Sequence, residues 1–157
     1  MILRQPSPSE AADIVAINQL AASYAEAMCR KSVREAVEVY ADDGRLLTPT
    51  TEAAVGREAI VETIERTVAS LDLLFIAVLN GLVQVDGDLA RGRFAIREWS
   101  VRSSDQQGFL FLGFYEDRLA RAPDGWRFTE RRLIPRTMAK VDFLTGKLHG
   151  LDDLRPW

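Results

Sequence analysis

The first part of the chain repeats apolar residues with the spacing of an amphipathic helix. The repeat begins after Ser7 and continues to about residue 30 through Ile14, Ile17, Ala21, Tyr24 and Met28. Its start is marked by Ser-Pro-Ser-Glu at residues 7–10, which supplies a capping hydroxyl, a proline at the first helical position and a glutamate three residues after the cap. This pattern predicts a long helix that turns Tyr24 towards the core.

Two shorter repeats predict two further helices. The first covers residues 33–42, with Val33, Val37 and Tyr40 on its buried side. A short strand is expected at residues 45–48. A third helix is expected at residues 57–70, where the apolar positions are Ile60, Ile64 and Val68. Three helices are therefore expected before the main sheet.

After residue 71 the helical period gives way to long segments rich in β-branched and aromatic residues. Four such segments lie at residues 73–85, 89–101, 109–121 and 126–136. Short polar connections separate them, and Asp86-Gly87 is the strongest of these hairpin signals. We therefore expect an α+β fold, with helices first and then a curved antiparallel sheet that closes over them.

The strand at residues 89–101 separates charged from apolar side chains by simple alternation. Its three arginines share one face, whereas Phe94, Ile96 and Glu98 share the other. The arginine face should be the wetter one, which places Glu98 towards the core. A buried carboxylate is costly unless it is paired or hydrogen-bonded, so Glu98 is the most informative residue of the chain.

The last two strands supply candidate neighbours for Glu98. In residues 126–136, alternation puts Arg132 on the same side as Trp126 and Phe128, where it could hold the Glu98 carboxylate in a bidentate pair. The strand at residues 109–121 is apolar on both faces. Its Tyr115 therefore faces either the interior or a second subunit, and a homodimer through the sheet is expected.

The composition of the chain excludes several kinds of binding partner and site. At 157 residues the chain fits one domain, and its 20 basic residues are scattered among 23 acidic ones, which predicts no nucleic-acid surface. No apolar run approaches the ~18 residues of a membrane span, so a cytoplasmic protein is expected. A single Cys29 and a single His149 supply neither a disulfide nor a His/Cys metal site, and no metal or cofactor is expected.

Five segments together resemble the SnoaL-like branch of the NTF2-like superfamily. They read AINQLAASYAEAMCRKS for the first helix, AVEVYADDGRL for the second helix and first strand, VGREAI for the third helix, LNGLVQVDGDLARGRF for the central hairpin and YEDRLARAPDGWRFTERRL for the last one. The likeness covers about residues 10–136. It implies an NTF2-like cone, in which a strongly bent sheet surrounds the helices and an apolar pocket opens at the wide end. Residues 137–157 are expected as an extension that packs on the body, as a lid or a dimer contact.

The resemblance implies several chemistries, because members of the superfamily include polyketide cyclases, ketosteroid isomerase, scytalone dehydratase, limonene epoxide hydrolase and dehydrochlorinases. The tyrosine that donates to an oxyanion in ketosteroid isomerase matches Tyr24, but the aspartate base of that enzyme falls near Thr48. The aspartate and histidine pair of the dehydratases falls at Ser32 and near residues 76–77, so both partners are absent. Asn80 matches an asparagine that is common in the branch.

The leading hypothesis is a SnoaL-like pocket protein that isomerises, dehydrates or cyclises a small hydrophobic oxygenated compound without a cofactor. Glu98 would transfer the proton, because an apolar cavity raises the pKa of a carboxyl group towards neutrality. Tyr24 would donate to a developing oxyanion, and Arg132 would hold Glu98 or bind an acidic group. The expected ligand-binding residues are Asn80, Tyr115, Arg132, Phe94 and Ile96.

Other hypotheses stay open, including whether the protein is an enzyme at all. The absent aspartate and histidine pair favours a non-catalytic small-molecule-binding or accessory module with the same fold. A third hypothesis is a subunit-assembly role like that of the small subunits of ring-hydroxylating oxygenases. For single residues the structural alternatives are an ion pair for Glu98, a core aromatic for Tyr24 and an amide that satisfies backbone groups for Asn80.

Overall fold

The computed structural model describes residues 5–142 of the chain, and its first element is the long helix expected from the apolar repeat. Helix α1 spans Pro8–Cys29 and carries the predicted capping box. The Ser7 hydroxyl accepts a hydrogen bond from the backbone N–H of Glu10 at 3.3 Å, and the Glu10 carboxylate accepts one from the Ser7 N–H at 2.8 Å. Tyr24 lies on the buried side of the helix, as predicted.

The next segment contains less helix than the sequence indicated. Helix α2 covers only Val33–Val37, and strand β1 spans Tyr40–Leu47. The backbone N–H of Phe128, far along the chain, donates to the carbonyl of Val39 at 3.0 Å. A tertiary contact thus replaces the next helical turn, because it takes an acceptor that a longer helix would use.

Strand β2 (Ala54–Val55) and helix α3 (Arg57–Val68) complete the first half of the described chain. The third helix therefore begins where the sequence predicted. However, β1 and β2 lie between α2 and α3 in the chain, so the three helices do not form one uninterrupted block before the sheet.

Four long strands form the predicted series of hairpins. They are β3 (Leu71–Asp86), β4 (Leu89–Arg102), β5 (Gly108–Ala122) and β6 (Gly125–Val141). The complete sheet has six strands in the order β2-β1-β6-β5-β4-β3. Strand β1 runs parallel to β6 and all other neighbours are antiparallel, so the sheet is mixed rather than a pure meander. The α+β fold class is confirmed.

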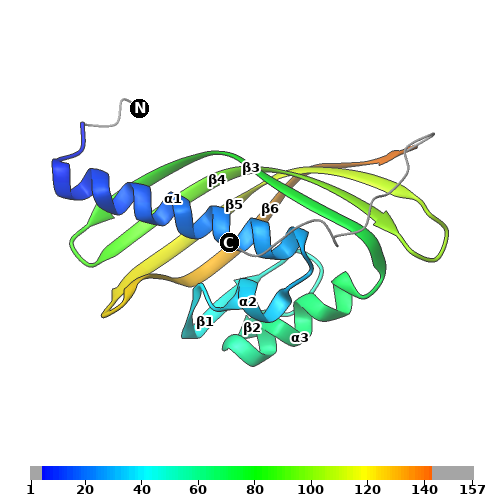
Figure 1. Ribbon diagram of the computed structural model, residues 1–157, viewed down its shortest axis with the longest axis horizontal. Helices are drawn as coiled ribbons and strands as arrows, with labels where there is room; N and C mark the ends of the chain where they lie inside the picture. Colours follow the sequence, from blue (N-terminus) through cyan, green and yellow to red (C-terminus); the bar gives the residue numbers. More distant parts are fainter. Residues whose placement is uncertain (1–4, 143–157) are drawn as a thin grey trace.

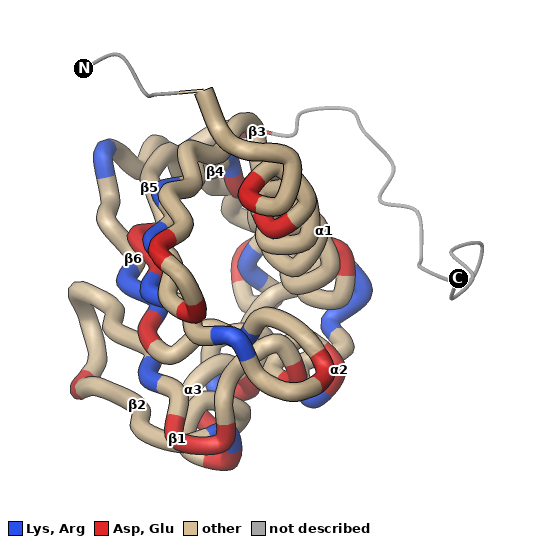
Figure 2. Tube along the Cα trace, turned by 90° about the vertical axis from the view of Figure 1, so that its left-hand side faces the viewer, with Lys and Arg blue, Asp and Glu red and all other residues tan. Residues whose placement is uncertain are grey.

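The sheet curves around a core that the helices close (Figure 1). Helix α1 lies along the concave side, and α2 and α3 cover the end formed by β1 and β2. In the view of Figure 2, β3 to β6 arch over one side of the interior and α1 stands on the other. Asp13 fixes the start of α1 to the last hairpin, since its carboxylate accepts from Trp126 at 3.1 Å and from Arg121 at 2.8 Å.

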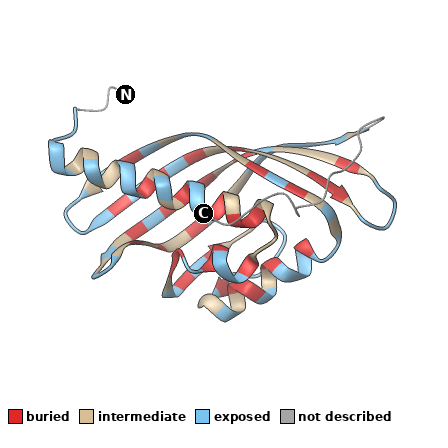
Figure 3. Cartoon of the chain, viewed as in Figure 1, coloured by how far each residue is buried: buried red, intermediate tan, exposed pale blue. Residues whose placement is uncertain are grey.

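Strand β4 has the two faces that simple alternation predicted. Along the strands, buried positions alternate with exposed ones (Figure 3). Phe94 and Ile96 are almost fully buried, and Phe94 is packed so closely that its neighbours must be glycines. A Cβ atom built on Gly81 or on Gly92 would lie 2.5 Å from the Phe94 ring. The concave face is therefore closely packed around Phe94.

Among the β-bulges of the sheet, two decide which residues face the interior near Glu98. On β3, Val78 pairs with Ile96 and Asn80 pairs with Ala95, so Leu79 is an extra residue. On β6, Phe128 pairs with Leu119 on β5 and Glu130 pairs with the adjacent Arg118, which makes residue 129 the extra one. Each bulge reverses the face that every later residue of its strand presents.

Within residues 5–142, no helix is both long and apolar enough to cross a membrane. His149 and most of the predicted C-terminal extension lie outside the described residues.

Candidate functional site

Glu98 lies on the concave face of β4, as alternation predicted. Its strand neighbours are Ile76 on β3 and Phe111 on β5. The side chain is partly buried, and no residue between 5 and 142 forms a hydrogen bond or an ion pair with its carboxyl group. Burial raises the pKa of Glu98 to about 7. Glu98 is thus a carboxyl group that changes its protonation near neutral pH.

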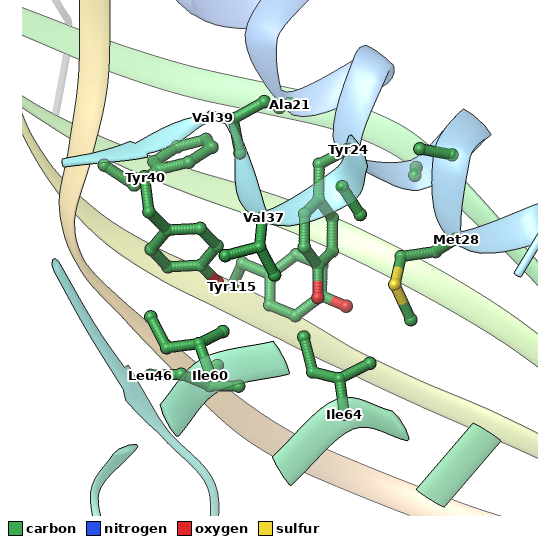
Figure 4. Packing of buried hydrophobic residues seen from close by; sticks show 14 of the residues in the cluster. Ala21, Tyr24, Met28, Val37, Val39, Tyr40, Leu46, Ile60, Ile64 and Tyr115 are labelled. Atoms are coloured by element: carbon green, nitrogen blue, oxygen red, sulfur yellow. The ribbon is translucent and has the colours of Figure 1, made fainter. Parts of the chain in front are cut away.

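Three buried tyrosines from three elements converge in the interior (Figure 4). Tyr24 comes from α1, Tyr40 from β1 and Tyr115 from β5. The Tyr24 ring meets the Tyr115 ring edge-on at 5.9 Å between centroids and the Tyr40 ring at 6.2 Å. Burial raises the pKa of all three phenols above the ordinary value, so each keeps its proton at neutral pH and can donate it in a hydrogen bond.

Beside the tyrosines lies a fully buried ion pair. Arg131 on β6 donates to both carboxylate oxygens of Asp117 on β5, from Nε at 2.9 Å and from Nη2 at 2.7 Å. The Arg131 guanidinium also stacks on three rings, with its Cζ atom 4.4 Å from the centroid of Tyr24, 4.2 Å from that of Tyr115 and 4.1 Å from that of Phe128. Such stacking suits a planar, weakly hydrated cation.

The ion pair is charged on both sides. Burial raises the pKa of Asp117, and the adjacent guanidinium offsets part of that rise. Burial works against the charge of Arg131, but the Asp117 carboxylate outweighs it and raises the pKa of Arg131. The two short parallel hydrogen bonds are those of a carboxylate and a guanidinium.

Glu98 and Arg131 both act electrostatically on Tyr24 and Tyr115. After burial and Arg131, the charge of Glu98 is a further cause that shifts the pKa of Tyr24. Two enclosed polar atoms, the Tyr40 hydroxyl and Nη1 of Arg131, have no hydrogen-bond partner among the described residues. The interior therefore combines a carboxyl group of near-neutral pKa with neutral phenol donors and a fixed positive charge.

The prediction that Arg132 holds Glu98 is wrong. Arg132 is exposed on the convex face of the sheet, where its guanidinium lies 3.7 Å from Glu130. The bulge at residue 129 is the reason, because the extra residue turns Arg132 outwards and Arg131 inwards.

Asn80 is likewise not on the concave face. The bulge at Leu79 turns it to the exposed convex side, opposite Ala95. By contrast, Phe94, Ile96 and Tyr115 all face the interior. Of the two orientations predicted for Tyr115, towards the interior or towards a second subunit, the structure has the first. The structure thus brings Tyr24, Tyr115, Phe94, Ile96 and Glu98 to one side of the sheet and leaves Asn80 and Arg132 on the other.

Sequence reasoning missed three interior residues. Asp117 lies two residues after Tyr115 on the same strand, so alternation places both on one face. The sequence therefore contained a signal for the inward position of Asp117, but it was not used. Tyr40 was predicted to be buried, but on a helix rather than on a strand. Arg131 had no usable signal, because its inward position depends on the bulge at residue 129.

Among the described residues, no cluster of three or more His, Cys, Asp or Glu side chains is arranged to bind a metal ion. Cys29 is tied to the sheet, since its sulfur accepts a hydrogen bond from the Ile76 N–H at 3.1 Å. Burial raises the pKa of this thiol, which makes it a core residue rather than a nucleophile.

Comparison with known proteins assigns the family. The family model described as a SnoaL-like domain matches residues 9–132. The chain belongs to the SnoaL-like domain family. An uncharacterised protein of Mycobacterium tuberculosis is 28% identical over 127 residues, which cover 80% of this chain and 86% of that protein.

Solved structures with this fold carry the names of enzymes. A Novosphingobium aromaticivorans protein described as a scytalone dehydratase has a TM-score of 0.78 and 16% identity, covering 85% of this chain and 90% of that one. A hexachlorocyclohexane dehydrochlorinase of Novosphingobium barchaimii has a TM-score of 0.81 and 13% identity. The match covers 89% of this chain and 97% of that one. At these identities the likeness establishes the fold alone.

Removing one partner of the buried ion pair should strongly destabilise this SnoaL-like domain. Asp117→Asn leaves the Arg131 charge buried without a counter-charge, and we expect the free energy of unfolding to fall by about 3–5 kcal/mol. The matched control is Asp105→Asn, which breaks the exposed pair with Arg102 (2.6 Å) and should cost less than about 1 kcal/mol. Urea unfolding measures both, and equal losses would contradict a special role for the buried pair.

Glu98 should make stability depend on pH. Its folded-state pKa of about 7 lies above the ordinary 4.5, so the folded protein binds this proton more tightly than the unfolded chain does. The resulting stabilisation is complete below pH 4.5 and is lost as the pH rises to 7. Glu98→Gln cannot ionise, so its stability relative to the native protein should increase by about 2–3 kcal/mol from pH 5 to pH 8. A difference that stays constant over this range in urea unfolding would show that Glu98 ionises normally.

Proposed function

We propose that this SnoaL-like domain is an isomerase, dehydratase or cyclase that acts on a small hydrophobic oxygenated compound by acid and base chemistry, without a cofactor. The observation that carries the proposal is Glu98, a carboxyl group without a protein partner among residues 5–142, whose burial raises its pKa to about 7. A carboxyl group that only stabilised the fold would be paired, as Asp117 is. Perturbed carboxyl groups of this kind are typical of proton-transfer sites.

In this proposal Glu98 is the general base that removes a proton next to a carbonyl or hydroxyl group. Negative charge then develops on the substrate oxygen, and the neutral phenols of Tyr24 and Tyr115 are the donors that stabilise it. The fixed charge of Arg131 favours the same anion from behind the tyrosines. Phe94 and Ile96, both almost fully buried, keep the interior around Glu98 apolar.

The structural relatives support this class of reaction without selecting a substrate. The two named above are described as a dehydratase and a dehydrochlorinase, names that denote eliminations. Elimination begins with the removal of a proton from carbon, which is the task assigned here to Glu98.

Glu98→Gln should abolish proton transfer while the fold is retained. The probe is 2-tetralone, a hydrophobic ketone with acidic α-hydrogens, and the measurement is the rate of deuterium exchange into it by NMR. We expect the rate to fall by about 10²–10⁴-fold in Glu98→Gln and, in the native protein, to fall as the pH decreases below about 7, because the base becomes protonated.

The control for this experiment is Glu116→Gln, which changes a carboxylate on the convex face of the neighbouring strand and should keep the native rate. Tyr24→Phe should lower the rate without moving the pH midpoint. Equal exchange by Glu98→Gln and the native protein would sink the assignment of the base.

A binding or accessory module without catalysis is the second candidate function. The specific observation in its favour is that Ile76, opposite Glu98, and the adjacent Ala77 are apolar. The resemblance to the dehydratases implies a histidine near these two positions, so Glu98 would have to act without that partner. Saturable binding of 2-tetralone with no exchange above the buffer rate would favour this candidate over the enzyme.

We further propose that the protein forms a homodimer through the convex face of its sheet. The support is an apolar surface there, in which Phe75 is 50% exposed and packs edge-on against Trp99 at 5.9 Å, with Leu112 36% exposed on β5. Exposed apolar patches of this kind commonly mark protein contacts.

Charges placed in this surface should separate the copies. Phe75→Glu combined with Leu112→Glu is expected to shift sedimentation from a dimer to a monomer, because carboxylates would be desolvated at the interface. Val15→Glu is the control, since Val15 is 68% exposed on helix α1, away from the convex face. A native protein that sediments as a monomer would end the dimer proposal.

A further inference from the structure

The convex face also carries a groove of about 430 Å³ that has no part in the interior chemistry. Two neighbouring rows of side chains, each crossing four strands, line most of it. One row is Leu82, Arg93, Glu116 and Arg132, and the other is Gln84, Arg91, Arg118 and Glu130. The position of each side chain follows from the register, including the bulge at residue 129 that turns Arg132 outwards. Figure 2 marks the basic and acidic positions along these strands.

Carboxylates accompany only some of the arginines in the groove. Arg93 pairs with Glu116 at 2.5 Å. Glu130 lies between two cations, 3.3 Å from Arg45 and 3.7 Å from Arg132. The lining holds four arginines against Glu116, Glu130 and Asp117, and the charge of Asp117 is already balanced by Arg131. The groove therefore has an excess of positive charge, in a protein whose net charge is −3. The groove is therefore a local attractor for anions.

Arg91 and Arg118 are the two arginines of the groove that form no ion pair among residues 5–142, because Glu130, the neighbour of Arg118 on β6, lies against Arg45 and Arg132 instead. Arg91 and Arg118 are direct cross-strand partners on β4 and β5, both are exposed, and neither guanidinium forms a hydrogen bond or an ion pair with any residue between 5 and 142. Like charges directly opposite each other on one face of a sheet are destabilising. An arrangement of this kind becomes favourable when an anion binds between the two guanidinium groups.

We propose that this groove is a binding site for a small doubly charged oxyanion, such as a phosphate group, held between Arg91 and Arg118. Two planar guanidinium groups present parallel N–H donors that match the oxygens of a phosphate or a carboxylate. A groove of this volume has room for a small organic molecule that carries such a group. Leu82 at one side contacts its apolar part, and the Gln84 amide provides a further polar contact.

The test is a calorimetric titration of the full chain with inorganic phosphate at pH 8 and constant ionic strength. The native protein should bind phosphate saturably, and Arg91→Ala combined with Arg118→Ala should weaken binding by about tenfold or more, because charge-assisted hydrogen bonds are lost. Arg34→Ala combined with Arg66→Ala is the control, since both arginines lie on helices outside the groove, and it should bind phosphate like the native protein.

A second variant keeps the proposal falsifiable if alanine perturbs the sheet. Arg91→Glu replaces the repulsion with an ion pair to Arg118, and its other direct neighbour is the uncharged Gln84, so without phosphate it should melt at a higher temperature than the native protein. With phosphate its melting temperature should not rise further, whereas that of the native protein should. Equal phosphate binding by the alanine variant and the native protein, or no binding by the native protein, would overturn the site.

Two further measurements extend the test. The first asks whether the ligand is a phosphate or a dicarboxylate, and the second asks whether the site depends on the proposed dimer. Succinate bound more tightly than phosphate, with the same dependence on Arg91 and Arg118, would support the site with dicarboxylates as its ligands. The Phe75→Glu and Leu112→Glu variant should still bind phosphate. Loss of phosphate binding in that variant would overturn the proposal, because the groove would then exist only between two copies.

Discussion

The ion pair between Arg131 and Asp117 is the constraint on which the interior depends. Both side chains are completely buried, so neither charge is tolerable without the other. The pair joins β5 to β6, and the arginine also stacks on Tyr24, Tyr115 and Phe128. One cation thus sets the spacing between helix α1 and two strands, at the place where the rings of Tyr24 and Tyr115 meet.

Asp117 and Glu98 lie on the same face of one sheet, but their surroundings give the two carboxyl groups different protonation behaviour. Asp117 has a counter-charge and two short hydrogen bonds, which occupy it fully. Glu98 has only apolar strand neighbours, and burial raises its pKa to about 7. The first is suited to stability and the second to proton transfer, because only the second changes its charge near neutral pH.

The two faces of the sheet carry different chemistry. The concave face gathers phenols, one free carboxyl group and a caged guanidinium in an apolar setting. The convex face has an apolar part around Phe75 and Trp99 and, further along the same strands, the arginine-rich groove. Two residues that the family likeness or alternation suggested for the interior, Asn80 and Arg132, belong to this outer face. Their roles are therefore questions about the surface of the domain.

The sequence by itself determined the α+β class, the capped first helix, the third helix, the hairpins and the inward position of Glu98, because these follow from local periodicity and turn chemistry. It also carried the likeness to the SnoaL-like family, which the match over residues 9–132 confirms. Only the tertiary structure decided which residues share the interior with Glu98. Each bulge adds a residue that no periodicity reveals, so Arg131 rather than Arg132 faces inwards and Asn80 faces out. A tertiary contact also decided where α2 ends. The Val39 carbonyl accepts a hydrogen bond from Phe128, a residue distant in the chain, so Tyr40 lies on a strand rather than on the predicted helix.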